Sequence, residues 1–168
     1  MLGSGLFSVD RLSSVHPNTE RVAAALAAKG ASGRIVELAE SAPTAQAAAD
    51  LLGCEVGAIA NSLVFDADGI PLLVMTSGAH RVDVERVAAL VGAAKVKRAT
   101  PEFVRAATGQ PIGGVAPVGH PAPLRTLVDV WLEKHPVVWA AGGHPHTVFP
   151  TTYDELLRLT DGAPADIA

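Results

Sequence analysis

Two apolar, strand-like segments at positions 59–65 and 70–76 are separated by the tetrapeptide Asp-Ala-Asp-Gly. Asp and Gly accept the left-handed backbone that a tight turn between paired strands needs, so this pattern predicts an antiparallel β-hairpin. A second turn sequence, Gly-Gly-His-Pro at 142–145, separates the strand-like segments 137–141 and 146–149 and predicts another hairpin. Two hairpins exclude a sheet made only of parallel strands, because parallel neighbours need a crossover connection.

Helix signals surround these hairpins. Thr44 and Thr100 suit the N-cap position, Gly53 and Gly109 suit the position after a helix, and Pro101 suits a first turn. Apolar spacing predicts helices over 18–29 (capped by Asn18 or Thr19), 45–52, 83–91, 101–108 and 153–159. Short strands are expected over 34–38, around Val96 and over 124–131. We therefore expect an α/β chain of the α+β type, with a mixed, largely antiparallel sheet and helices packed around it.

The composition is that of one folded domain. The chain has 168 residues, of which 49% are hydrophobic and 18% charged, and this balance argues against disorder. We expect an N-terminal lead-in over 1–16 and a single domain over 17–168. One cysteine, Cys54, excludes an internal disulfide framework and a multi-cysteine zinc site, and it reads as a small buried hydrophobe. No segment has the pattern of a signal peptide or a membrane span, so a cytoplasmic location is expected.

The segment 109–123 is the most irregular part of the sequence. Its four glycines and four prolines exclude a helix or a central strand. Glycines let a ligand approach the main chain closely, and exposed N–H groups there can hold a phosphate, a carboxylate or an ester carbonyl. A surface connection without a ligand is the alternative interpretation.

Asn61 and Ser62 are polar residues within the first strand of the 59–76 hairpin. Alternation places Asn61 on one face with Ile59, Leu63 and Phe65, and Ser62 on the other. A buried amide needs hydrogen-bond partners, so Asn61 either bonds to the backbone in the core or faces a cavity.

The histidines give a weak metal-site signal. His144 and His146 are two positions apart, but Pro145 lies between them and no nearby carboxylate completes a ligand set. Solvated turn residues are the preferred interpretation for them, and no metal is expected. The sequence also lacks a Gly-x-Ser-x-Gly elbow, a Walker loop and a dinucleotide-binding fingerprint.

Four blocks of the sequence resemble the YbaK/ProX-type aminoacyl-tRNA deacylases, relatives of the editing domain of bacterial prolyl-tRNA synthetases. The first block runs from Thr-Ala-Gln-Ala-Ala-Ala at 44–49 to Ile-Ala-Asn-Ser-Leu-Val-Phe at 59–65. The second is Leu-Leu-Val-Met-Thr-Ser-Gly-Ala-His-Arg-Val-Asp at 72–83, the third is the loop Gly-Gly-Val-Ala-Pro-Val-Gly at 113–119, and the fourth spans 137–148. They occur in the family's order over about residues 20–162.

The resemblance implies a barrel-like sheet and hydrolysis of the ester that joins a wrongly attached small amino acid to the 3′ end of tRNA. It implies no metal and no organic cofactor, and its partners would be aminoacyl-tRNA and an aminoacyl-tRNA synthetase. The residues expected to act on the ester are Asn61, Gly113 and Gly114, and those expected to bind substrate are Ser62, Gly78, His80, Pro117, Gly119, His120 and Asp129. For His80 and His120 an assisting role competes with that of exposed turn residues, and for Asp129 an ordering role competes with an exposed or capping one.

Asn61 departs from the family pattern, which typically has lysine in an Ile-Ala-Lys-Ser/Thr-Leu block. Asparagine donates neutral hydrogen bonds but offsets no charge. Loss of one such contact often reduces a rate by roughly a hundredfold, or about 3 kcal/mol. A family member that binds tRNA or a synthetase without hydrolysis is therefore the alternative function, and a hydrolase of small esters or amides is a third.

The net charge of −4 disfavours a protein that binds nucleic acid over its whole surface. A deacylase that holds only the terminal adenosine and its amino acid meets few phosphates. We therefore expect weak, salt-sensitive binding at the tRNA end.

Overall fold

The computed structural model describes residues 6–8 and 16–168 of the chain. The helices of this part are α1 (Pro17–Ala28), α2 (Ala45–Leu52), α3 (Val84–Val91), α4 (Pro101–Thr108) and α5 (Tyr153–Thr160), with the 3-10 turns η3 (Val56–Ala58) and η4 (Val130–Lys134). The strands are β1 (Leu6–Ser8), β2 (Val36–Leu38), β3 (Ile59–Ala67), β4 (Ile70–Ser77), β5 (Val96–Arg98), β6 (Arg125–Asp129), β7 (Val138–Ala141), β8 (Thr147–Thr151) and β9 (Ala163–Ala165).

The strands form one mixed sheet in the order β1-β2-β8-β7-β3-β4-β6-β9, and β5 pairs separately with β3. Five strand pairs are antiparallel, whereas β3 with β7, β4 with β6 and β6 with β9 are parallel. The expected mixed, largely antiparallel sheet is therefore confirmed. The described strand path is open at β1 and β9, so the expected barrel-like form does not extend to a closed barrel.

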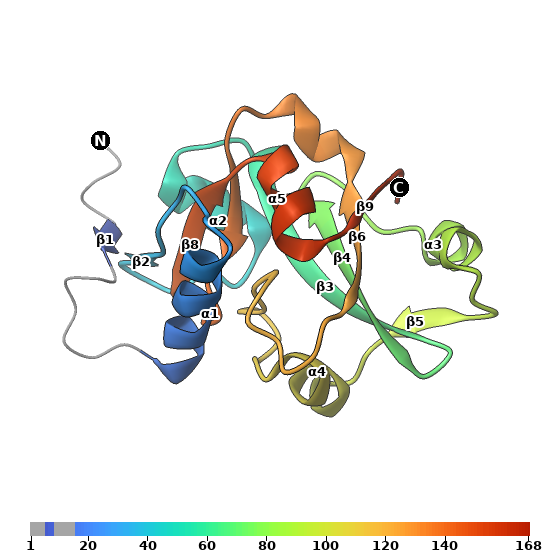
Figure 1. Ribbon diagram of the computed structural model, residues 1–168. Helices are drawn as coiled ribbons and strands as arrows, with labels where there is room; N and C mark the ends of the chain where they lie inside the picture. Colours follow the sequence, from blue (N-terminus) through green and yellow to red (C-terminus); the bar gives the residue numbers. More distant parts are fainter. Residues whose placement is uncertain (1–5, 9–15) are drawn as a thin grey trace.

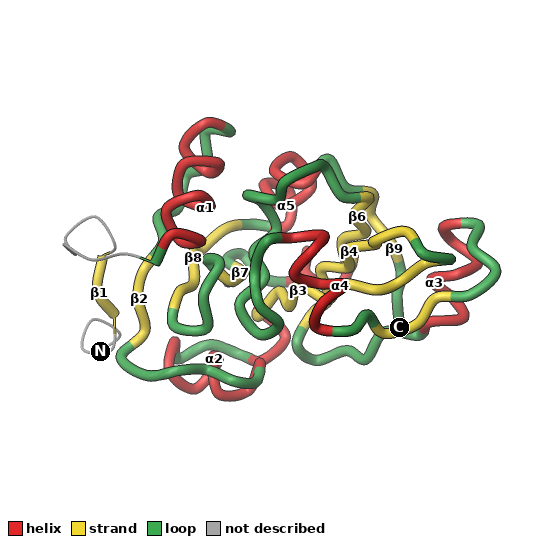
Figure 2. Tube along the Cα trace, turned by 90° about the horizontal axis from the view of Figure 1, so that it is seen from below, coloured by secondary structure: helices red, strands yellow, loops and turns green. Residues whose placement is uncertain are grey.

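Helices cover both faces of this sheet. Side chains of α1, α4 and α5 pack with Ala60 and Val64 in one cluster, whereas α2 packs with Ile59, and α3 packs with Phe65. Seen from below, α1 and α5 lie on one side of the strands and α2 lies on the other (Figure 2). The predicted separation of Ala60 and Val64 from Ile59 and Phe65 on opposite strand faces is thus confirmed.

The elements with strong local signals form as predicted. Asp68 and Gly69 have positive φ in the β3–β4 turn, Thr44 and Thr100 cap α2 and α4 with their side chains, and Gly53 ends α2 in a left-handed conformation.

Helix α1, strand β6 and strand β9 differ from the prediction. Helix α1 begins at Pro17 and is capped by His16, whose Nδ1 accepts from the Asn18 N–H at 3.1 Å, so Asn18 and Thr19 are not its caps. Strand β6 ends at Asp129 because this side chain caps η4 by accepting from the Trp131 N–H at 2.9 Å. Strand β9 was not predicted.

The expected lead-in over residues 1–16 contains a strand, since β1 pairs antiparallel with β2. Residues 1–5 and 9–15 lie outside the described part of the chain. Within residues 6–8 and 16–168, no helix combines the length and the apolar character that a membrane crossing requires.

Pairing of β3 is interrupted along one edge. On that edge β7 pairs with Ile59 and Ala60, and β5 pairs with residues 65–67, so residues 61–64 have a ladder partner only in β4. Figure 1 shows β3 crossing the centre of the molecule, with α3 and β5 at its far end. This gap in the sheet positions the candidate site.

Candidate functional site

A cavity of about 310 Å³ opens at the gap beside β3; we call it the Asn61 cavity. Its walls come from residues 59–65 of β3, the start of α2, the segment 112–115 of the Gly/Pro loop, and the β7–β8 hairpin. The cavity therefore brings Asn61 and Ser62 together with Gly113, three residues that the sequence places in two distant segments.

The Asn61 side chain is half-buried in this wall. Within the described residues its amide makes no hydrogen bond, and it is not among the fully buried polar groups that lack a partner. The amide is thus accessible from the cavity and available to a ligand. Of the two interpretations of Asn61, the structure matches the cavity-facing one.

Ser62 contributes to the cavity from the opposite face of β3. Its hydroxyl donates to the Met75 sulfur at 3.2 Å, so the side chain is tied to β4. What Ser62 can offer a ligand is mainly its backbone.

Backbone groups of Ser62 and Val64 point into the gap. The carbonyl of Ile59 accepts from the Gly78 N–H on the β4 side at 2.8 Å. Since backbone groups alternate along a strand, those of Ser62 and Val64 face the opposite edge, where no strand pairs with them. The cavity therefore presents an unpaired strand edge, which sequence reasoning missed because the interruption depends on where β5 and β7 end.

The two neighbouring loop glycines have different roles. Gly113 lines the cavity with φ of 91°, and a Cβ there would meet nothing within 4 Å. Gly114 is buried against the β7–β8 turn, where a Cβ would lie 2.8 Å from the His144 carbonyl carbon, and its N–H donates to Pro111 at 3.1 Å. The Gly113 N–H remains a candidate donor to an oxyanion, whereas the Gly114 N–H is engaged in a turn.

Gln110 holds the loop from within and was not predicted. Its side chain is 1% exposed. Its Oε1 accepts from the Ala116 N–H at 2.6 Å, and its Nε2 donates to the Val118 carbonyl at 3.2 Å. A glutamine inside a Gly/Pro-rich segment was the available signal, since backbone groups of such a loop need a partner.

Gly78, His80 and Asp129 lie together but do not line the Asn61 cavity. Asp129 is 1% exposed; its Oδ2 is 2.8 Å from His80 Nδ1 and accepts from the Ser77 N–H at 3.0 Å. Gly78 approaches the Val56 carbonyl so closely that a Cβ would lie 2.4 Å away. The alternative of an exposed residue is wrong for Asp129, which is buried, and its capping role is confirmed. His80 is half-buried, with 19% of its side chain exposed, and its assisting role stays a prediction.

Pro117, Gly119 and His120 line a different hollow, which has no lining residue in common with the Asn61 cavity. His120 Nε2 donates to the Ala116 carbonyl at 2.8 Å, and burial lowers the pKa of this imidazole. The predicted substrate-binding set is thus divided among three places.

Three of the remaining histidines, His16, His144 and His146, cluster at the β7–β8 turn, whereas His135 Nδ1 lies 3.7 Å from Glu55 Oε2. The His144 ring lies 4.9 Å from that of His16 and 5.4 Å from that of His146. Burial lowers the pKa of His144 most, and the charges of these two neighbouring histidines lower it further. Residues 6–8 and 16–168 contain no group of three or more His, Cys, Asp or Glu side chains arranged to hold a metal ion. Cys54 is half-buried at the α2 cluster, and burial raises the pKa of its thiol.

Arg98 is the one charged residue among the described residues that line the Asn61 cavity. It is exposed at the end of β5, and its guanidinium has no hydrogen-bond or ion-pair partner in the part of the chain that the structure describes. Ile112, 56% exposed, and Trp139 add apolar surface to the walls. The site thus offers amide and backbone donors, apolar walls and one cation, a set that suits a ligand with a polar carbonyl, an apolar part and an anion.

Comparisons with known proteins agree with these features. The model of the aminoacyl-tRNA editing domain family matches residues 39–159. A proline–tRNA ligase of Nitratidesulfovibrio vulgaris (strain DP4) is 33% identical over 117 residues, which cover 70% of this chain and 19% of that enzyme. An uncharacterized protein of Bacillus subtilis (strain 168), YwhH, is 29% identical over 127 residues, covering 75% of this chain and 80% of YwhH. The chain therefore spans about a fifth of the ligases that it matches.

Solved structures give the same result. One, described as a candidate trans-editing enzyme for prolyl tRNA synthetase, is 44% identical with a TM-score of 0.86, covering 92% of this chain and 98% of that one. Another, a hypothetical protein named APE2540, is 28% identical with a TM-score of 0.81, covering 88% and 98%. Because the family model accounts for most of the chain, this protein belongs to the aminoacyl-tRNA editing domain family.

Proposed function

We propose that this protein is a trans-editing hydrolase, which removes a wrongly attached small amino acid from the 3′ end of tRNA by hydrolysis of the ester bond. The observation that carries the proposal is the Asn61 cavity, which is lined by both the free Asn61 amide and the Gly113 backbone. Membership of the editing family supports the substrate class. The cytoplasm, where tRNA is charged, is the compartment that this activity requires.

The cavity suits an aminoacyl ester in three respects. The apolar surface of Ile112 and Trp139 suits a base or a small side chain, and the unpaired backbone of Ser62 and Val64 suits the ribose or the amino group. Arg98 suits a phosphate, since a guanidinium binds phosphate oxygens by charge-assisted hydrogen bonds. No dedicated general base faces the cavity among the described residues that line it.

Hydrolysis then proceeds with the substrate's own groups. A water oxygen attacks the ester carbonyl carbon. The water proton passes to the substrate's amine, or to its free ribose hydroxyl as that hydroxyl gives up its own proton, and from there a proton reaches the ester oxygen of the ribose. The developing oxyanion accepts hydrogen bonds from the Asn61 amide and the Gly113 N–H. The bond to the ribose oxygen breaks, that oxygen takes a proton, and the products are a free amino acid and tRNA.

Asn61 limits the rate in this mechanism. A neutral amide stabilises an oxyanion less than an ammonium group does, and one such contact is worth about 3 kcal/mol, or roughly a hundredfold. Hydrolysis of an activated ester remains feasible with the smaller contribution.

The test measures release of amino acid from tRNA charged in turn with alanine, cysteine, serine and threonine. The tRNA that accepts proline is the first choice of acceptor, because relatives include proline–tRNA ligases. We expect release above background for at least one amino acid, loss of at least about tenfold in Asn61→Ala, and a faster rate in Asn61→Lys.

The exposed Gln46→Ala on α2 serves as the control variant and should retain the wild-type rate. Absence of release with every charged tRNA would reject the hydrolase and favour the non-hydrolytic binding module. Release from free aminoacyl esters that tRNA does not compete with would favour a hydrolase of small esters instead. An unchanged rate in Asn61→Ala would remove this residue from the mechanism.

A further inference from the structure

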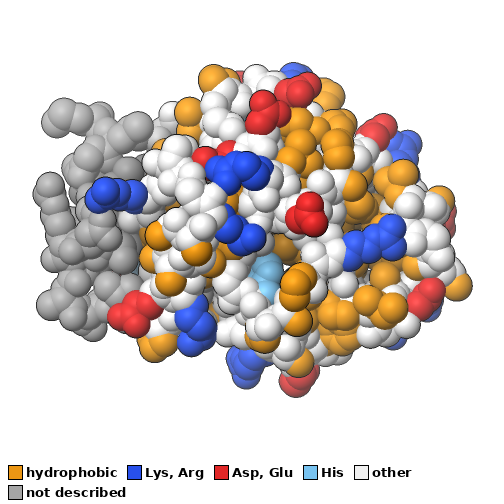
Figure 3. All heavy atoms as spheres, viewed as in Figure 1, with side chains coloured by type: hydrophobic (Ala, Val, Ile, Leu, Met, Phe, Trp, Pro, Cys, Tyr) orange, Lys and Arg blue, Asp and Glu red, His pale blue; other side chains and the backbone are white. Residues whose placement is uncertain are grey.

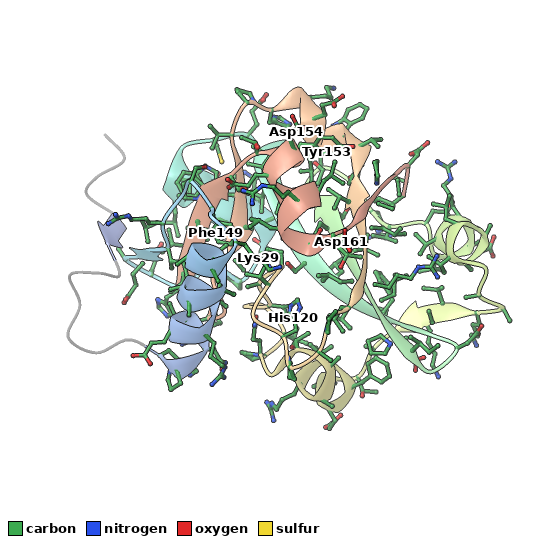
Figure 4. The ribbon with its side chains drawn as sticks, viewed as in Figure 1. Lys29, His120, Phe149, Tyr153, Asp154 and Asp161 are labelled. Atoms are coloured by element: carbon green, nitrogen blue, oxygen red, sulfur yellow. The ribbon has the colours of Figure 1, made fainter. Side chains whose placement is uncertain are left out.

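A second hollow, of about 360 Å³, lies beside the later part of the Gly/Pro loop; we call it the His120 pocket. Residues 117–124 of the loop form one wall, and Lys29 after α1 and residues 159–161 at the end of α5 form the other. Figure 3 shows a histidine side chain exposed in a hollow near the middle of this face. In the same view, Figure 4 labels His120 there, with Lys29 and Asp161 above it.

Two opposite charges flank this pocket without neutralising each other. Within the described residues the side chains of Lys29 and Asp161 form no ion pair or hydrogen bond, with each other or with another group. The main chain at Lys29 is fixed, because its N–H donates to the Ala25 carbonyl and its carbonyl accepts from Arg158. A cation and an anion are thus carried on ordered backbone at one opening.

His120 adds a neutral acceptor. Its Nε2 faces the Ala116 carbonyl, which can only accept, so Nε2 carries the proton and Nδ1 keeps its lone pair. Burial lowers the pKa of the imidazole, which keeps the ring neutral near pH 7. No described group bonds to Nδ1.

Most of the remaining lining is apolar, and the hydroxyls of its two threonines, Thr126 and Thr160, donate to the main-chain carbonyls of Leu124 and Leu156. The apolar lining includes Pro117, Pro121, Pro123, Leu124 and Leu159. A ligand that satisfies this pocket therefore needs an anionic group, a cationic donor and a small apolar part.

We propose that the His120 pocket binds a free α-amino acid with an apolar side chain. Its carboxylate lies toward Lys29, its ammonium toward Asp161 and His120 Nδ1, and its side chain against the loop prolines. An aminoacyl ester has no free carboxylate to place toward Lys29. The two hollows have no lining residue in common, so this site is separate from the Asn61 cavity and the proposal does not rest on the deacylase activity.

The test is an NMR titration of the full chain with L-leucine, followed at the His120 imidazole. N-acetyl-L-leucine, which lacks the cation, and L-leucinamide, which lacks the anion, are the matched probes. We expect saturable shifts with L-leucine and binding at least about tenfold weaker for each derivative, because each lacks one charge-assisted contact. Lys29→Gln should weaken the binding of L-leucine but not that of L-leucinamide. Asp161→Asn should weaken the binding of L-leucine but not that of N-acetyl-L-leucine.

Lys29 and Asp161 are both exposed, and asparagine accepts the φ of 51° at position 161, so both variants should fold. Asn61→Ala is the control and should leave the titration unchanged. The proposal is overturned if L-leucine gives no saturable shift, if the three probes bind alike, or if Asn61→Ala abolishes binding.

Discussion

Gln110 is the residue on which the conformation of the Gly/Pro loop depends most directly. Its amide replaces the strand or helix partners that Ala116 and Val118 lack, and it does so from a fully buried position. An unsatisfied buried backbone group costs about 1–3 kcal/mol. One side chain thus holds the loop that carries Gly113 at the Asn61 cavity and His120 at the His120 pocket.

Gln110→Leu should therefore destabilise the protein although the side chain keeps its size. Leucine leaves the Ala116 N–H and the Val118 carbonyl without partners, so the free energy of unfolding should fall by about 1–3 kcal/mol in urea denaturation. Gln46→Leu, on the exposed face of α2, is the matched control and should change stability by less than about 0.5 kcal/mol. Equal stability of the two variants would mean that water satisfies the loop.

Asn61 and Gln110 show how far single residues could be interpreted from the sequence. The polar residue in an apolar strand was identified, because strand alternation alone places it beside Ile59 and Leu63. That its amide is free depends on the missing strand partner beside it, which no local pattern encodes. His80 and Asp129 form a pair across 49 positions of sequence, so their proximity was equally hidden.

At the scale of elements, the hairpins and capped helices could be predicted because their signals are local. Thr44, Thr100 and the Asp68–Gly69 turn each act within a few residues. Strands β1 and β9 have three residues each and depend on partners far along the chain. The cavity also arises at this scale, because β5 and β7 end before they meet along β3.

Gly113→Ala tests the loop as an element of the site. Its φ of 91° is unfavourable for a side chain, so alanine forces the backbone at the cavity wall to shift. We expect deacylation to fall at least about tenfold and stability to fall by about 1–2 kcal/mol. Gly92 lies at the end of α3 with φ of 72° and open space around it. Gly92→Ala should therefore reduce stability by a similar amount and keep the wild-type activity. Equal activity of both variants would contradict a role of the Gly113 backbone in the reaction.

At the scale of the whole molecule, the net charge of −4 restricts how tRNA can be held. The acidic surface disfavours a long contact with the phosphate backbone. Arg98 places one positive charge at the cavity, whereas the other described lining residues are uncharged. Under the proposed function, this distribution favours binding that is confined to the tRNA end.

Arg98→Gln should therefore change the salt dependence of tRNA binding more than its specificity. Each phosphate contact on a single strand contributes about −0.7 to the slope of log K against log salt. The slope should therefore become less negative by about 0.7 when this contact is lost. Arg86→Gln removes the same charge from α3, where Arg86 pairs with Asp166 at 3.0 Å, and should leave the slope unchanged. Binding would be measured by fluorescence anisotropy with tRNA labelled at its 5′ end. An equal change in both variants would indicate that net charge, and not a phosphate contact at the cavity, governs the affinity.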